Sequence, residues 1–149
     1  MASIEDIKKL RDETGASPVK IKKALEESGQ DFEKAKELLK SWGAAKAGEK
    51  GGRQTNEGAI DFYVHPNAKS GVLLDIRCET DFVAKNPDFK NLAHEICLHI
   101  AAMNPETVEA LLVQPWVKDA GKTIQNLIEE AVAKTGENIE VRKFVRYEI

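Results

Sequence analysis

The chain has 149 residues, of which 42% are apolar and 32% charged, and its formal net charge is −3. This composition is typical of a globular protein, either one medium domain or a small and a larger one, and the weak negative charge argues against a general nucleic-acid binder, which needs a basic face. No apolar run reaches the roughly 18 residues of a membrane span. The N-terminus carries acidic residues and enters a helical pattern at once, so we expect no signal peptide and a cytoplasmic protein.

The first part of the chain predicts three short helices. Ser3 caps the first, Pro18 takes the first helical position of the second after a serine cap, and Asp31 caps the third. Apolar residues follow at helical spacing in each segment, and Gly43 ends the third. We therefore expect residues 1–43 to form a compact three-helix domain.

Residues 44–58 differ in composition from what precedes them. They contain four glycines and no large apolar residue, which is typical of a linker. We expect this segment to separate two domains and to be flexible, at least from Gly48 to Gly52.

Residues 59–149 predict a domain of another kind. Two segments of alternating apolar and polar residues flank the turn at residues 65–71, which indicates an antiparallel hairpin in which Ile60, Phe62 and Val64 share one face. Two segments at helical spacing follow, and the last residues alternate again as a strand. The order β-β-α-α-β predicts an α+β fold, in which helices cover one face of a three-stranded antiparallel sheet.

No local motif predicts an enzyme, a metal site or a nucleotide site. The segment Gly121–Thr123 suggests a phosphate loop, but that loop needs a glycine five residues before its Gly-Lys pair, and Trp116 stands there, so we interpret the segment as a helix start. His94 and His99 are five residues apart, which is off the i, i+4 spacing of helical metal ligands. We expect no bound metal and no cofactor.

Cys78 and Cys97 are the only cysteines of the chain. Both fall on the inward faces of their predicted elements, so we expect reduced, buried thiols. The basic run Lys20–Lys23 has two interpretations: the solvated side of the second helix, which we favour on the residues alone, or a positive surface for an acidic partner.

The connection C-E-T-D-F-V-A-K-N-P, residues 78–87, raises a question about its apolar residues. Phe82 and Val83 stand where a connection is usually polar. A hydrophobic staple does not explain them, because the position before the Asn86 cap holds Lys85.

Two interpretations of Phe82 stay open at this point. A cap at Thr80 or Asp81 would start a single helical turn and hold Phe82 outward. Alternatively, Phe82 folds back over the end of the sheet.

Segments in three separate parts of the chain carry a resemblance to a known family. T-D-F-V-A-K-N, Thr80–Asn86, resembles the hallmark segment of the translation elongation factor Ts family. L-R-D-E-T-G-A (Leu10–Ala16) and K-K-A-L (Lys22–Leu25) resemble its N-terminal domain, and K-T-G-E-N-I-E-V-R-K-F (Lys134–Phe144) resembles its closing helix and strand. The matches stand in the expected order over nearly the whole chain.

The resemblance implies a fold and a function. The three-helix unit would be similar to ubiquitin-associated domains, and the rest would be an exchange-factor core. Members of the family release GDP from the GTPase elongation factor Tu so that GTP can replace it, without a cofactor or covalent chemistry. The resemblance implies that Asp81 and Phe82, within Thr80–Val83, enter the GTPase beside its magnesium and nucleotide site, and that Lys22 contacts it near the guanine-binding region.

The chain departs from the family pattern in several places. Pro18–Ile21, P-V-K-I, stands where the family has M-M-D-C, and only eight residues separate Met103–Pro105 from Gln114–Trp116, where other members have a longer helical insert. One core unit is present, whereas longer members carry two. Single-core members are expected to work as homodimers, and we expect Phe144 and Arg146, on the outward side of the last strand, to serve that interface.

Two other functions compete with this one. A ubiquitin-associated-like adaptor without exchange activity would explain the three helices but leaves T-D-F-V unexplained. A small enzyme would need a convergent set of polar residues, and the local sequence offers none.

Overall fold

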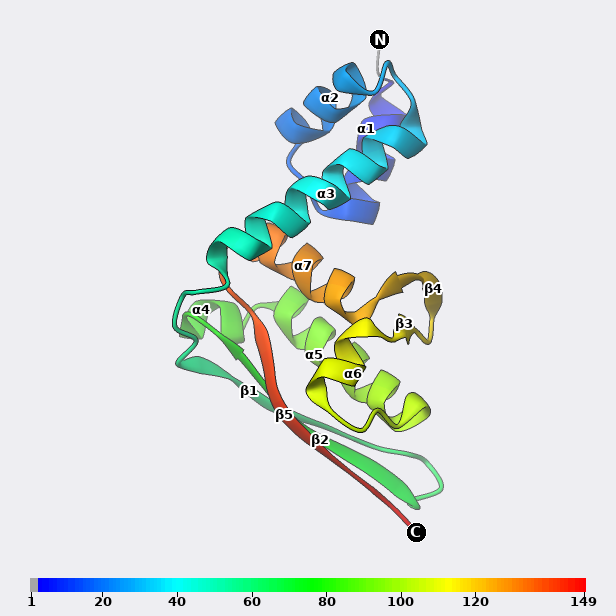
Figure 1. Ribbon diagram of the computed structural model, residues 1–149, viewed down its shortest axis with the longest axis vertical. Helices are drawn as coiled ribbons and strands as arrows, with labels where there is room; N and C mark the ends of the chain where they lie inside the picture. Colours follow the sequence, from blue (N-terminus) through cyan, green and yellow to red (C-terminus); the bar gives the residue numbers. More distant parts are fainter. Residues whose placement is uncertain (1–2) are drawn as a thin grey trace.

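The computed structural model describes residues 3–149, apart from the side chain of Lys46. Three helices open the described chain: α1 (Ile4–Thr14), α2 (Pro18–Glu27) and α3 (Phe32–Lys50). The remainder contains β1 (Glu57–Val64), β2 (Ser70–Cys78), α4 (Asp81–Ala84), α5 (Pro87–Met103), α6 (Val108–Val113), β3 (Pro115–Trp116), β4 (Asp119–Thr123), α7 (Ile124–Thr135) and β5 (Glu140–Glu148). The α+β class is confirmed, and Figure 1 shows the helical end and the sheet end of the molecule.

The helices α1 to α3 form a unit with its own apolar core. The predicted caps are present: the side chains of Ser3, Ser17 and Asp31 each accept a hydrogen bond from the backbone N–H three residues later. Such caps satisfy orphan N–H groups at the first turn and so fix where each helix begins. The buried residues of this unit are Leu10, Ile21, Ala24, Leu25, Ala35 and Leu39.

Helix α3 does not end at Gly43, as the sequence predicted, but continues to Lys50. The stretch beyond Gly43 includes three alanines, the strongest helix formers, and it packs on α7. Ala47 contacts the apolar core of the α+β part, and the Lys50 Nζ donates to the Gly136 carbonyl at 2.5 Å. The expected flexibility from Gly48 to Gly52 is therefore wrong for the helical part. The domain boundary within residues 44–58 stays a prediction.

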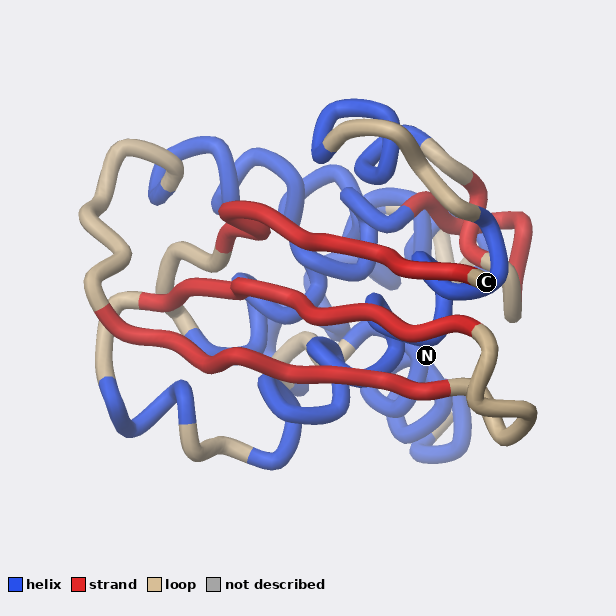
Figure 2. Tube along the Cα trace, turned by 90° about the horizontal axis from the view of Figure 1, so that it is seen from below, coloured by secondary structure: helices blue, strands red, loops and turns tan. Residues whose placement is uncertain are grey.

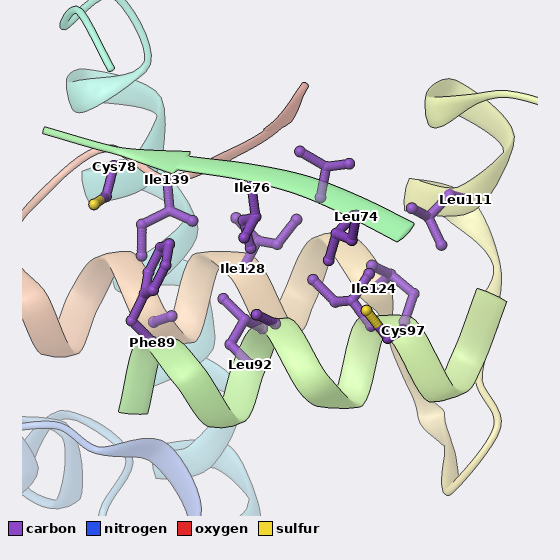
Figure 3. Packing of buried hydrophobic residues seen from close by; sticks show 14 of the residues in the cluster. Leu74, Ile76, Cys78, Phe89, Leu92, Cys97, Leu111, Ile124, Ile128 and Ile139 are labelled. Atoms are coloured by element: carbon purple, nitrogen blue, oxygen red, sulfur yellow. The ribbon is translucent and has the colours of Figure 1, made fainter. Parts of the chain in front are cut away.

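The α+β part is a three-stranded antiparallel sheet with strand order β1-β2-β5. Helices α5 and α7 pack on one of its faces, and β3 and β4 form a separate small hairpin. Figure 2 shows the three strands in front with the helices behind them. Side chains from β2, α5 and α7 meet in what we call the main core (Figure 3); its largest fully buried members include Leu74, Ile76, Phe89, Ile96, Ile100, Leu111 and Ile124.

A β-bulge in β5 reverses the expected facing of its second half. Val141 pairs with Ile76 and Lys143 pairs with Asp75, which leaves Arg142 as an extra residue between them. An inserted residue shifts the two-residue alternation by one, so every side chain beyond it changes face.

Phe144 and Arg146 therefore face the helices, and their predicted outward placement is wrong. Phe144 packs against the main core. The Arg146 guanidinium donates two hydrogen bonds to the Ala101 carbonyl of α5, at 3.2 Å from Nε and 3.0 Å from Nη2. Neither side chain is available to an interface on the open side of the sheet.

The open side of the sheet carries an apolar surface beside the Asp75–Arg77 ion pair, whose atoms lie 2.6 Å apart. We call it the outer face, and its exposed apolar residues are Ile60, Phe62, Val64, Leu73, Val145 and Tyr147. Phe62 pairs with Leu73 and Leu73 pairs with Val145, so one apolar row crosses all three strands. The face that Ile60, Phe62 and Val64 share is thus turned away from the helices, and Figure 2 shows no element in front of it.

The helical conformation of α3 beyond Gly43 can be tested by substitutions at Gly48. The space around the Cα of Gly48 is open, so a methyl group fits there. In a helix, Gly48→Ala should raise the free energy of unfolding by about 0.5–1 kcal/mol, and Gly48→Pro should lower it by about 3 kcal/mol. Urea unfolding followed by circular dichroism measures both. If both substitutions leave stability unchanged, this segment is a flexible linker.

Candidate partner-binding site

The segment Thr80–Lys85, which we call the site turn, is a single helical turn between β2 and α5. The Thr80 Oγ1 accepts a hydrogen bond from the Val83 N–H at 3.4 Å, so Thr80 is the N-cap. The chain restarts at once in α5, where the Asn86 side chain accepts from the Asp88 N–H at 2.8 Å. Two successive caps start two separate helices, and the first of them is one turn long.

Phe82 points into solvent. Its side chain is 87% exposed, whereas the next two residues, Val83 and Ala84, are 8% and 7% exposed and belong to the main core. On one helical turn these neighbours take the inward side, which leaves Phe82 on the opposite side. Of the two interpretations left open by the sequence, the outward one is correct.

Asp81 forms an ion pair within the site turn. Its carboxylate lies 2.7 Å from the Lys85 Nζ, four residues on, and both side chains are mostly exposed. This hydrogen bond raises the pKa of Lys85. Asp81 is therefore not the cap of the turn, and because exposed pairs contribute little to stability, its carboxylate can change partner at small cost.

A carboxylate far along the chain holds the start of the site turn. Glu137, in the connection between α7 and β5, accepts from the Glu79 and Thr80 backbone N–H groups at 3.2 and 2.9 Å through Oε1. Its Oε2 accepts from the Thr80 hydroxyl at 2.7 Å. The sequence indicated K-T-G-E-N only as a family match and gave Glu137 no role, because nothing local relates it to a segment nearly sixty residues earlier.

The thiol of Cys78 lies beneath the same turn. Its Sγ donates to the Thr80 carbonyl at 3.2 Å, and burial raises the pKa of the Cys78 thiol to about 11. Burial likewise raises the pKa of Cys97 to about 12. Both cysteines are free and buried, as predicted, and both stay protonated at neutral pH, so neither is a nucleophile.

Lys22 is exposed on α2, whose buried residues are Ile21, Ala24 and Leu25. Its neighbour Lys23 is engaged differently: the Lys23 Nζ lies 3.9 Å from the Glu27 carboxylate and 5.6 Å from the centre of the Trp42 ring. Figure 1 shows α2 and α4 well apart, so the structure does not bring Lys22 to the site turn. The two predicted contact regions are separate surfaces.

The G-K-T segment belongs to a strand and a helix cap. Gly121 and Lys122 lie in β4, and the Lys122 Nζ pairs with the Glu130 carboxylate at 2.9 Å. The helix that the sequence placed here begins one residue later than the segment, at Ile124, with Thr123 as its N-cap in a capping box. The basic side chain is thus committed to the protein itself.

His99 is a structural residue. It is fully buried, its Nδ1 accepts from the Val117 N–H at 3.2 Å, and its Nε2 lies 2.9 Å from the Gln114 side-chain oxygen. Burial lowers the pKa of His99.

Within residues 3–149 no cluster of three or more His, Cys, Asp or Glu residues is arranged to hold a metal ion. In the same residues, no helix is long and apolar enough to cross a membrane.

An exposed aromatic side chain on a turn fixed to the core is typical of a protein-binding surface rather than of an enclosed catalytic pocket. The family profile described as Elongation factor TS matches residues 79–149. Proteins named Elongation factor Ts from Rubrobacter xylanophilus and Coprothermobacter proteolyticus are 40% and 42% identical to this chain, and the aligned regions cover 98% and 94% of those relatives and 98% and 95% of this chain. The chain belongs to the elongation factor Ts family of translation elongation factors.

Two of the relatives differ from this chain in length. The alignment with the Rubrobacter protein spans 191 positions, more than the 149 residues present here, so that relative has residues that this chain lacks. Elongation factor Ts from Aquifex aeolicus is 46% identical over 98% of this chain, but the match covers only 52% of the Aquifex protein. Where the extra residues fall relative to α5 and α6 stays a prediction.

Proposed function

We propose that the chain is a guanine-nucleotide exchange factor that binds elongation factor Tu carrying GDP and accelerates the release of GDP. The observation that carries the proposal is the placement of Phe82, 87% exposed on a turn whose two following residues are buried. Family membership supports elongation factor Tu as the partner. The protein acts through contact alone, without a cofactor and without covalent chemistry.

Phe82 acts as a wedge beside the magnesium and phosphate site of the GTPase. Mg²⁺ needs near-ideal octahedral geometry at about 2.0–2.1 Å, so a small displacement of the elements around it weakens the whole nucleotide site. Burying a phenylalanine yields about 1.5–3 kcal/mol, which matches a typical coupling free energy of about 1–3 kcal/mol between two ligands. The contact can therefore drive the displacement.

The other residues of the site turn have distinct roles in this proposal. Thr80 caps the turn and Val83 fastens it to the main core, so both hold Phe82 in place. Asp81 lies next to Phe82 with an exposed carboxylate. Near bound phosphates that carboxylate adds charge repulsion, which favours loss of GDP.

Lys22 makes a second contact, through the exposed side of α2 and near the guanine-binding region of the GTPase. Because α2 lies apart from α4, the contacts of Lys22 and of Phe82 would fall on different parts of the partner (Figure 1). Val19, on the same exposed side of α2, adds apolar surface to this contact.

Phe82→Ala should fold normally, because the side chain has almost no packing to lose, but should slow factor-stimulated GDP release about tenfold or more. Release of fluorescent GDP from elongation factor Tu, with and without the chain, measures this effect. Val113→Ala, an exposed apolar residue on α6, is the matched control and should behave as the wild type.

The possible outcomes separate the function from its mechanism. If the wild-type chain leaves GDP release unchanged, the exchange function is contradicted. If Phe82→Ala stimulates release as well as the wild type, the function stands and the wedge is wrong.

We also propose that the chain works as a homodimer through its outer face. Exposed apolar side chains of β1, β2 and β5 lie next to one another across the three strands, and a contiguous apolar surface of this kind is typical of a protein–protein contact. A second copy related by a two-fold axis places the same face opposite it, as two sheets packed about 10 Å apart. Phe144 and Arg146, once expected here, instead fasten β5 to the main core and to α5.

The dimer is tested by placing a charge in the apolar row. Leu73→Asp should leave the monomer folded, because the side chain is half exposed, but should prevent dimer formation, because the dimer would bury the charge. Light scattering after size-exclusion chromatography measures the mass and so distinguishes monomer from dimer. Ile4→Asp, a charge at an exposed apolar position of α1, should stay dimeric. A wild-type chain that is monomeric at high micromolar concentration contradicts the proposal.

A further inference from the structure

We propose that Glu137 is a positioning residue for exchange: its carboxylate sets the direction in which the site turn presents Phe82. The inference rests on the proposed function, in which Phe82 enters the GTPase. It adds a residue from the far end of the chain to a site that otherwise consists of one local segment. Figure 1 shows that the α7–β5 connection and α4 lie at the same end of the sheet.

Both carboxylate oxygens of Glu137 hold the start of the site turn, and we call this arrangement the clamp. One carboxylate oxygen accepts from two successive backbone N–H groups, those of Glu79 and Thr80, and the other accepts from the Thr80 hydroxyl. In return, the Glu79 carboxylate accepts from the Asn138 backbone N–H at 2.7 Å. Hydrogen bonds to ionised acceptors are roughly twice as strong as neutral ones, so the two segments are joined firmly in both directions.

The clamp continues into the cap of the site turn. The Thr80 hydroxyl has one proton, which it donates to Glu137, and its oxygen accepts from the Val83 N–H. Glu137 therefore orients the hydroxyl so that a lone pair is free for the cap. A chain of two hydrogen bonds runs from the α7–β5 connection to the first turn of α4.

Phe82 depends on this clamp because the short helix α4 is held in place only by its anchors, of which Glu137 is one. Helix α4 has four residues, far fewer than a helix needs to be stable alone, so its orientation comes from its anchors. Val83 and Ala84 hold its underside, and Glu137 holds its N-terminus. An exposed side chain has no packing of its own to fix it, and an ordered turn lowers the entropy that binding would otherwise have to remove.

The backbone that delivers Glu137 is specialised for a sharp exit from α7. Gly136 closes the helix with φ 76°, a left-handed conformation that favours glycine. The turn it makes brings the next residue directly onto Glu79 and Thr80. The segments T-G-E-N and E-T-D-F-V, far apart in the sequence, are thus joined by one set of hydrogen bonds.

The test compares Glu137→Ala with Glu137→Gln in the GDP-release measurement, made on the 149-residue chain. Glu137→Ala should lower the maximal release rate, at saturating factor, by about fivefold or more, the lower end of typical coupling. Glu137→Gln keeps one oxygen acceptor for the two backbone N–H groups and should recover most of the rate. Glu140→Ala is the matched control, because that carboxylate makes a similar clamp to Thr55 and Arg142 without touching the site turn.

A double-mutant cycle distinguishes positioning from a general effect on the fold. If Glu137 acts through Phe82, adding Glu137→Ala to Phe82→Ala should cause no further loss. An equal further loss, or a wild-type rate for Glu137→Ala alone, overturns the inference while the exchange function stands. A wild-type chain that leaves GDP release unchanged overturns the proposed function and this inference together.

Discussion

The burial of Val83 and Ala84 in the main core is the interaction on which the rest of the site depends. It fastens a single helical turn to the end of the sheet and so leaves the residue before them in water. Phe82 consequently keeps about 1.5–3 kcal/mol of transfer free energy unused in the free protein. This free energy would be released when a partner buries the side chain. The exposed side chain contributes almost nothing to the stability of the fold.

Local signals predicted much of the architecture from the sequence. The caps at Ser3, Ser17 and Asp31, the alternation in β2 and the helical spacing in α5 all act within a few residues, and the structure contains each of these elements. The buried thiols followed from the same periodicity. Where neighbours in sequence determine the structure, the sequence was sufficient.

The features that the sequence did not predict depend on distant contacts. Helix α3 runs past its glycine because it packs on α7, and Phe144 faces inward because β5 contains a bulge opposite Asp75 and Ile76. The direction of Phe82 required knowing that Val83 is buried. The role of Glu137 was not predicted because its partners lie 57 and 58 residues earlier in the chain. Rules based on residue spacing cannot predict contacts between such distant residues.

The most direct test of the wedge is a comparison of two affinities, those of the chain for nucleotide-free and for GDP-loaded elongation factor Tu. Coupling is reciprocal, so the wild-type chain should bind the nucleotide-free form more tightly by the same factor by which it weakens GDP. Phe82→Ala should lose most of this preference for the nucleotide-free form. Equal affinities for the wild type, or an unchanged preference in Phe82→Ala, would contradict the claim that this side chain displaces GDP.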